Sequence, residues 1–152
     1  MLRSLLIIVA PLCLFALSSC IDSPDPVTGA APVGSKFSPF VSAHRGGAAY
    51  APEDTMSAYR NAARMGVDDF ETDTIATKDG VLVLIHDDTV DRTTNCSGAV
   101  NSFTLAELQQ CDAGYWWEPG QSTTTPNPDK PHPFRGKGIV VPTAQELFDF
   151  AK

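Results

Sequence analysis

The feature that most constrains the fold is a strand, a helix and a second strand in succession between residues 40 and 77. Residues 40–44 are apolar enough for a short strand, and Asp54 or Thr55 is placed to cap a helix that runs to Met65 and stops at Gly66. Residues 69–77 alternate as a second strand. Because a helix between two strands carries the chain back to the starting edge, the strands are expected to pair in parallel. The sequence therefore predicts an α/β fold.

A hairpin is predicted directly after the second strand. Lys78-Asp79-Gly80 is a turn signal, and residues 81–85 form a nearly continuous apolar strand. A two-residue Asp79-Gly80 turn pairs Lys78 with Val81, and counting outward from that pair sets Asp73 opposite His86. Directly opposed residues share one face of a hairpin.

Glu71, Asp73 and His86 are therefore expected to converge on one patch. Glu71 and Asp73 are two residues apart, so they project from the same face of the strand. Carboxylate oxygens suit Ca²⁺ or Mg²⁺, and an imidazole can move protons near neutral pH. His44 adds a second imidazole at the end of the first strand. Ligands of parallel α/β folds gather at the carboxyl ends of strands, which makes this patch a candidate active site.

The N-terminal segment predicts export. Arg3 precedes an apolar run over residues 5–17, which is too short to span a membrane but fits a signal over residues 1–19. Residues 17–20 resemble the lipobox of bacterial lipoproteins, so Cys20 is the expected lipidation site; an ordinary cleaved signal is the alternative. Ile21 after that cysteine favours a periplasm-facing anchor in the outer rather than the inner membrane. The Pro- and Gly-rich residues 20–39 then form a tether.

Charge and cysteine content limit the remaining classes. A net charge of -7 provides no basic surface for phosphate backbones, so no nucleic-acid partner is expected. Cys13 leaves with the signal and Cys20 takes the lipid, which leaves Cys96 and Cys111 as either two buried thiols or a disulfide favoured by an oxidising compartment. In the chain-entropy model, closing this loop stabilises by about 3 kcal/mol.

Six short motifs, in this order and spacing, resemble the signature of the glycerophosphodiester phosphodiesterase family. The resemblance covers the chain from about Val41 to Lys152 and ends in a Pro-Thr helix start before residues 144–151. The motifs are His44-Arg45-Gly46-Gly47, Pro52-Glu53-Asp54-Thr55, Glu71-Thr72-Asp73, Thr77-Lys78-Asp79-Gly80, His86-Asp87 and Asp91-Arg92-Thr93-Thr94.

The resemblance implies a TIM-type (β/α)8 barrel of the phospholipase-C-like phosphodiesterase kind. Such an enzyme hydrolyses glycerophosphodiesters to sn-glycerol 3-phosphate and an alcohol with one divalent cation, for which Ca²⁺ is favoured over Mg²⁺. Asp54 departs from the family pattern, which has asparagine there. The implied site consists of His44 and His86 as the acid/base pair, Arg45 on the substrate phosphate, Glu71 and Asp73 as metal ligands, and Glu53 beside metal and substrate.

Length limits how much of that barrel is expected. A complete barrel takes about 250 residues, whereas residues 40–152 suit an N-terminal part with about two βα units, truncated before the strand that supplies a third metal carboxylate. The loop-rich insertion at 95–142 holds a predicted helix over 104–110 and three aromatics, Tyr115-Trp116-Trp117, which either line a pocket for the alcohol or cover the barrel edge.

We expect little hydrolysis from this incomplete domain alone. The alternative functions are an inactive lipid-anchored remnant or a glycerophosphodiester-binding protein, a related phospholipase D of the sphingomyelinase type, and an unrelated exported structural lipoprotein. The alcohol preference, the oligomeric state and the attacking group, which is either water or a hydroxyl of the substrate's own glycerol, are left open.

Overall fold

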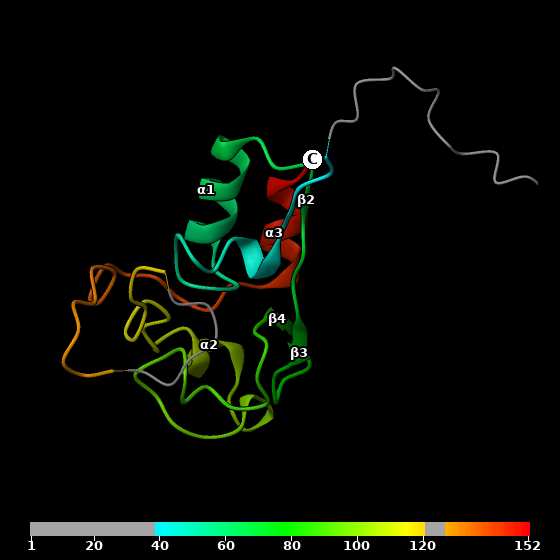
Figure 1. Ribbon diagram of the computed structural model, residues 1–152. Helices are drawn as coiled ribbons and strands as arrows, with labels where there is room; N and C mark the ends of the chain where they lie inside the picture. Colours follow the sequence, from blue (N-terminus) through cyan, green and yellow to red (C-terminus); the bar gives the residue numbers. More distant parts are fainter. Residues whose placement is uncertain (1–38, 121–126) are drawn as a thin grey trace, which may run out of the picture. The chain divides into compact units, whose positions relative to one another are not determined.

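A computed structural model describes residues 39–120 and 127–152 (Figure 1). The predicted signal at 1–19, the lipidation site at Cys20 and almost all of the tether at 20–39 lie outside the described residues. Among the described residues, no helix has the length and apolar character needed to cross a bilayer.

The predicted strand–helix–strand unit is present and its strands are parallel. β1 (Ser42–Ala43) pairs with β2 (Asp69–Phe70), and α1 (Met56–Met65) forms the crossover between them. Thr55 is the N-cap, because its side chain accepts a hydrogen bond from the backbone N–H of Ala58. The helix ends at Gly66 as predicted and buries its apolar face beside the sheet.

The turn after β1 lies unusually close to α1. A short 3-10 helix, η1 (His44–Gly46), follows the strand, and the N–H of Gly46 donates to the carbonyl of Glu71 at 3.2 Å. Gly46 has a φ of 75°, and a Cβ there would lie 2.9 Å from the Tyr59 ring. Only glycine fits this position, and its close contact with the helix fixes the neighbouring Arg45 at the end of β1.

The strand predicted over residues 69–77 is divided in two. After β2 the chain leaves its parallel partner, and β3 (Thr74–Ala76) pairs antiparallel with β4 (Leu82–Leu84) to form the predicted hairpin. Residues 71–73 connect the two pairings. The side chain of Thr72 turns toward α1, where its hydroxyl lies 2.6 Å from that of Tyr59.

The predicted hairpin register is wrong by one residue. Thr77 pairs with Val81, so the residue opposite Asp73 is Ile85, whose N–H donates to the Asp73 carbonyl at 3.1 Å. Ile85 is buried in the core, whereas His86 lies beyond the end of β4.

The cause of the different register is a three-residue turn in place of the expected two-residue one. The Thr77 hydroxyl donates to a carboxylate oxygen of Asp79 at 2.6 Å and accepts from the N–H of Val81 at 3.0 Å. Gly80 has a φ of 81°, the left-handed conformation that closes a three-residue hairpin loop. Hydrogen bonds from side chains thus decide the turn length here.

A second helix packs beside α1. α3 (Ala144–Phe150) begins at Thr143, which forms a capping box with Glu146. The ring of Phe150 stacks on Phe70 of β2 with centroids 6.2 Å apart, and α3 contacts both α1 and β4. Figure 1 shows α1 and α3 on the same side of β2. β1–α1 and β2–α3 are thus two βα units, as predicted.

The residues between β4 and α3 form a hydrophobic core with the hairpin, separate from the packing of α1 and α3 on the strands, and it is called the second core below. η2 (Val100–Ser102) and α2 (Leu105–Leu108) lie in this region, and Thr104 caps α2 within the predicted helix. The buried members of this core come from the β4 segment, η2, α2, the loops and the segment before α3, and they are Val83, Ile85, Val90, Val100, Leu108, Ala113 and Val141.

The aromatic residues of the insertion pack against their own loop. The guanidinium of Arg135 lies 4.1 Å from the centroid of the Tyr115 ring, and Trp117 packs edge-on against Phe134. The indole N–H of Trp117 also donates to the carbonyl of Ala48 at 2.8 Å. These contacts favour the prediction that the aromatic residues cover the edge of the barrel over the prediction that they line a pocket for the alcohol.

Cys96 and Cys111 are joined by a disulfide bond. It links the loop after β4 to the residues that follow α2, and it closes a loop with a sequence separation of 15. Cys111 is almost completely buried, 1% exposed, so the bridge belongs to the second core.

Replacing both cysteines by serine is expected to lower the free energy of unfolding by about 3 kcal/mol, because the unfolded chain regains the entropy of an open loop of this length. Urea unfolding followed by tryptophan fluorescence measures this change. Treating the unaltered protein with a reductant should give the same loss, and the double variant should then show no response to the reductant. Equal stability of both proteins would contradict a stabilising disulfide.

Candidate active site

Arg45 adopts a strained backbone conformation that its neighbours hold in place. Its φ is 49°, in the left-handed region that non-glycine residues rarely occupy. The N–H of Arg45 donates to Oε2 of Glu71 at 2.7 Å, and its carbonyl accepts from the N–H of Asp54 at 3.0 Å. The carboxylate of Glu71 and the backbone of Asp54 therefore fix the direction of the Arg45 side chain.

The guanidinium of Arg45 is buried between carboxylates. The residue is 7% exposed, and its Nη1 donates to Oε1 of Glu53 at 3.0 Å. Its Nε lies 3.8 Å from Oδ2 of Asp73, which is too long for a hydrogen bond. Within residues 39–120 and 127–152, neither Nε of Arg45 nor Oδ2 of Asp73 has a hydrogen-bond partner. One donor and one acceptor at this site are thus free for a ligand.

Arg92 bridges two carboxylates from different parts of the chain. Its Nη1 and Nη2 donate to the two oxygens of Glu53 at 2.8 and 2.6 Å. Its Nε and Nη2 donate to the two oxygens of Asp87 at 2.6 and 3.1 Å. Both pairings are bidentate, which is the geometry in which a guanidinium binds a carboxylate most specifically.

Asp87 in turn contacts His86. Nδ1 of His86 lies 2.7 Å from Oδ1 of Asp87. The hydrogen bonds from Arg92, more than the contact with His86, lower the pKa of Asp87 to about 2. Asp87 is therefore ionised at neutral pH and accepts hydrogen bonds from both neighbours.

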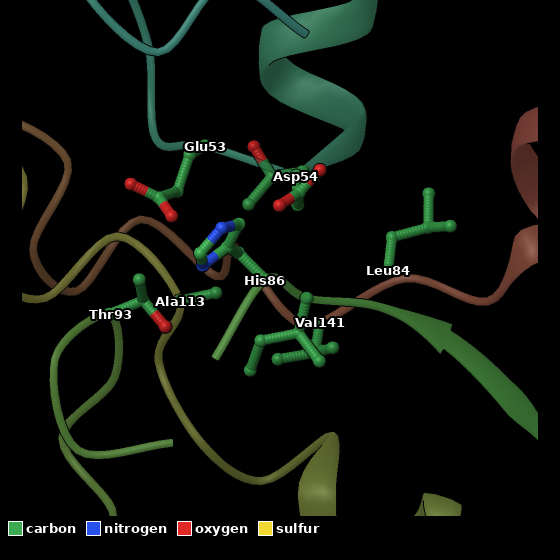
Figure 2. Close-up of a pocket in the computed structure, with 9 residues that line it drawn as sticks. Glu53, Asp54, Leu84, His86, Thr93, Ala113 and Val141 are labelled. Atoms are coloured by element: carbon green, nitrogen blue, oxygen red, sulfur yellow. The ribbon is translucent and has the colours of Figure 1, made fainter. Parts of the chain in front are cut away.

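Six residues of the predicted motifs form one connected network. It passes from the sheet through the two guanidiniums to the imidazole, in the order Glu71, Arg45, Glu53, Arg92, Asp87 and His86. Figure 2 shows His86 at the end of β4 facing Glu53 and Asp54, with which it lines a small pocket.

The two predicted acid/base histidines lie on different cavities. His44 is exposed and lines a groove of about 290 Å³ between β1 and α1, whereas His86 lines the pocket beside Glu53. The expected patch of Glu71, Asp73 and His86 does not form a metal-binding group, since the part of the chain that the structure describes contains no cluster of three or more His, Cys, Asp or Glu side chains suited to a metal ion. The shifted register, which sets Ile85 opposite Asp73, explains the difference.

Glu71 and Asp73 fit part of a metal site. Both offer oxygen ligands, which hard divalent cations prefer, and the buried Oδ2 of Asp73 has no hydrogen-bond donor among the described residues. Glu71 is already bound to the Arg45 N–H through one oxygen, which leaves its second oxygen for another partner. The pair thus suits a Ca²⁺ or Mg²⁺ ion as two ligands of a larger set.

Asp54 is buried although the family pattern has a neutral asparagine at this position. It is 2% exposed, and its Oδ1 accepts from the hydroxyl groups of Tyr59 at 3.0 Å and Thr72 at 3.2 Å. Burial raises the pKa of Asp54 to about 6, and it also raises the pKa of the Tyr59 hydroxyl. In mildly acidic solution Asp54 is therefore neutral, as asparagine would be.

Arg92 and Asp87 are the site residues to which sequence reasoning gave no role. Both lie in recognised motifs, but they are 5 positions apart in irregular chain, and no periodicity relates their side chains. Arg92 also reaches Glu53, 39 positions earlier in the chain. The sequence offered one sign of a role for these residues: Asp87 follows His86, and Arg92 follows Asp91, within short polar runs.

The family model of the glycerophosphoryl diester phosphodiesterase family matches residues 44–152. The chain belongs to this family. A glycerophosphodiester phosphodiesterase of Bacillus subtilis (strain 168) is 41% identical over 107 residues, which cover 70% of this chain and 34% of that protein. The chain spans about a third of the length of the curated relatives that it matches.

Solved structures of the family share this fold. The glycerophosphoryl diester phosphodiesterase domain of a Mycobacterium tuberculosis protein aligns with a TM-score of 0.64 and 34% identity, covering 74% of this chain and 40% of that one. An Oleispira antarctica phosphodiesterase in complex with the product sn-glycerol-3-phosphate aligns with a TM-score of 0.59 and 34% identity, covering 73% and 39%. The two βα units are thus part of a TIM-type barrel, and the fold prediction is confirmed.

Asp54→Asn is expected to remove a pH dependence of stability. The pKa of Asp54 is about 6 in the folded chain and 3.8 when the side chain is fully solvated. The folded chain therefore holds this proton more tightly than the unfolded chain does. The resulting stabilisation is fully present below pH 3.8 and is lost as the pH rises through 6. Relative to the variant, the unaltered protein should lose about 3 kcal/mol of unfolding free energy across this range. Urea unfolding at several pH values measures the difference. Asp129→Asn, at an exposed position, serves as the control, and parallel curves for the Asp54→Asn variant and the unaltered protein would refute the assignment.

Proposed function

We propose that the protein hydrolyses glycerophosphodiesters to sn-glycerol 3-phosphate and an alcohol, as a metal-dependent phosphoric diester hydrolase. The observation that carries the proposal is the hydrogen-bonded network that links Arg45 to His86 through Glu53, Arg92 and Asp87. Charge-assisted hydrogen bonds thus connect Arg45, which suits a phosphate group, to His86, which suits proton transfer. Membership of the family supports the same reaction.

Arg45 is the residue proposed to bind the substrate phosphate. Glu53 holds one of its terminal nitrogens, while its buried Nε has no acceptor among the described residues. A phosphodiester oxygen placed there completes the hydrogen bonding of the guanidinium. Because the Arg45 side chain is already buried and held by Glu53, little side-chain entropy is lost when the phosphate binds.

Glu71 and Asp73 are the residues proposed to hold a divalent cation. Such an ion supplies positive charge that offsets the negative charge developing on the phosphate. We favour calcium over magnesium, because Ca²⁺ accepts irregular sets of six to eight oxygen ligands whereas Mg²⁺ requires a near-ideal octahedron. Asp73 Oδ2 lies 3.8 Å from Arg45 Nε, which puts the proposed cation site next to the proposed phosphate site.

His44 and His86 are proposed as the acid/base pair. One imidazole removes a proton from the attacking hydroxyl, and the other donates a proton to the departing alkoxide. His44 directly precedes Arg45 at the end of β1, and His86 directly follows the buried end of the β4 segment. Both rings are exposed, as substrate access requires.

His44→Ala and His86→Ala are each expected to lower kcat by about 10²- to 10⁴-fold, the usual contribution of general acid/base catalysis. Hydrolysis of glycerophosphocholine with added Ca²⁺ is followed by an enzymatic assay for sn-glycerol 3-phosphate. His132→Gln is the control, because within residues 39–120 and 127–152 the His132 ring bonds to the backbone carbonyls of Trp117 and Asn127 and packs on Trp116, away from the proposed site. Its kcat should equal that of the unaltered protein.

The same samples separate hydrolysis from simple binding. Chelation by EDTA should abolish product formation, and Mg²⁺ should restore it less well than Ca²⁺ if the calcium preference holds. Suppose that calorimetry detects binding of glycerophosphocholine while no product forms at any metal concentration. That result would reject the hydrolase and favour a glycerophosphodiester-binding protein. Because little hydrolysis is expected from the incomplete domain alone, the absence of both binding and turnover rejects both functions when it is found in a protein that carries the complete barrel.

We also propose that the protein is an exported lipoprotein anchored through Cys20. The support is the sequence of residues 1–20, with its charged start, short apolar run and small residues before the cysteine. In a bacterial host fed a labelled fatty acid, the unaltered protein should carry the label and be found in the membrane fraction of the cells. The Cys20→Ser variant should carry no label. Labelling that persists in Cys20→Ser would contradict the assignment.

A further inference from the structure

We infer that Arg92 is a positioning residue that holds Asp87 against Nδ1 of His86, keeps the proton of the neutral ring on Nδ1, and so makes Nε2 the nitrogen that exchanges a proton with the substrate. The inference deepens the proposed function and rests on it for the role of His86. It concerns two residues, Arg92 and Asp87, to which the sequence assigned no task.

The short contact between His86 and Asp87 fixes the location of one proton. Nδ1 and Oδ1 are 2.7 Å apart, a hydrogen-bond distance, so a hydrogen lies between them. An ionised carboxylate only accepts hydrogen bonds, so this hydrogen belongs to the ring nitrogen. Arg92 keeps Asp87 ionised, since both oxygens of Asp87 accept from its guanidinium.

Arg92 also restricts where Asp87 can move. Its other hydrogen bonds go to both oxygens of Glu53, and Glu53 is held in turn by Arg45. A guanidinium has a planar and rigid arrangement of donors, so two bidentate contacts set the relative position of the two carboxylates. Asp87 is thereby kept at a fixed place relative to the phosphate-binding Arg45.

The loop that carries Arg92 is itself well anchored. Val90 and Thr94, on either side of Arg92, are completely buried, and the Thr94 hydroxyl donates to the Val90 carbonyl at 2.9 Å. The carboxylate of Asp91 accepts hydrogen bonds from the Ser97 hydroxyl and the Gly98 N–H. Arg92 therefore extends from a rigid segment rather than from a free surface loop.

The opposite nitrogen of His86 is left available. Within the described residues, no side chain or backbone group forms a hydrogen bond to Nε2, and the ring lines the pocket that Glu53, Asp54 and Thr93 share (Figure 2). When the ring is neutral, Nε2 carries the lone pair that accepts a proton; when the ring is charged, Nε2 carries the proton that is donated. Arg92 contacts neither Nε2 nor the pocket-facing edge, and acts through Asp87.

Nuclear magnetic resonance can read the tautomer directly. The chain has only three histidines, so a long-range proton–nitrogen spectrum of the ¹⁵N-labelled protein contains three rings, and His86→Gln identifies the signal of His86. At about pH 8.5, where histidine side chains are generally neutral, the unaltered protein should show a protonated Nδ1 and a lone-pair Nε2 at His86.

Arg92→Gln should remove this preference, so that the His86 signals move toward the averaged positions of a ring that exchanges between both tautomers. Asp87→Asn should have the same effect. Arg92→Lys, which keeps the charge but cannot form either bidentate contact, tests the geometry separately and should also weaken the preference. Arg60→Gln on the exposed side of α1 is the matched control and should leave the spectrum unchanged.

Two results would overturn the inference. One is a lone-pair Nδ1 at His86 in the unaltered protein, and the other is an unchanged His86 tautomer in both Arg92 variants with the circular dichroism of the fold intact. If Arg92→Gln does not fold, Arg92→Lys decides alone.

The spectrum requires no turnover, so it separates this inference from the proposed function. Suppose that the His86 tautomer depends on Arg92 but the protein has no hydrolase activity. The proposed function would then be rejected, and the positioning role of Arg92 would be retained. In an active protein, Arg92→Gln should lower kcat more than it changes KM, because Arg92 does not touch the substrate in this arrangement.

Discussion

The site depends on one carboxylate, that of Glu53, which lies between the buried guanidinium of Arg45 and the partly buried guanidinium of Arg92. It is 9% exposed in its side chain and accepts from Arg45 on one side and from Arg92 on the other. A single buried charge is expensive, and a buried ion pair is retained only when its hydrogen bonds are well satisfied. Without Glu53, the two positive groups would face each other with no charge between them. The Glu53 carboxylate thus supplies the negative charge that the guanidiniums of Arg45 and Arg92 share.

Much of the fold follows from patterns that act over short distances. The crossover helix, its cap at Thr55 and the parallel pairing of β1 with β2 were predictable, because each results from local periodicity and from capping chemistry. The hairpin was predictable in kind but not in register. Its register follows from the three-residue turn, which the Thr77 hydroxyl closes by donating to Asp79 and accepting from the N–H of Val81, and the Asp79-Gly80 pair alone does not reveal these hydrogen bonds.

The motifs pointed to part of the residues that the structure brings together, but not to their contacts. The ordered motifs drew attention to Arg45, Glu53 and His86, yet the resemblance implied only a phosphate contact for Arg45 and gave no sign of its hydrogen bond to Glu53. The structure pairs Arg45 with Glu53, and it inserts Arg92 between Glu53 and the histidine. Long-range pairs of this kind leave no mark in a single sequence, because nothing in the spacing of 39 residues relates the two side chains.

The spacing of these contacts along the chain has a consequence for the order in which the molecule folds. Arg45 and Glu53 are 8 residues apart, and Asp87 and Arg92 are 5 apart, so each half of the network can close within its own segment. The contact of Arg92 with Glu53 spans 39 residues and joins the strand–helix–strand unit to the loop after β4. Closing such a long loop has an entropic cost that local contacts do not recover. Completion of the site thus brings together two segments that are each ordered by contacts of their own, and the Arg92–Glu53 salt bridge acts there with other long-range contacts, such as the hydrogen bond from Trp117 to Ala48.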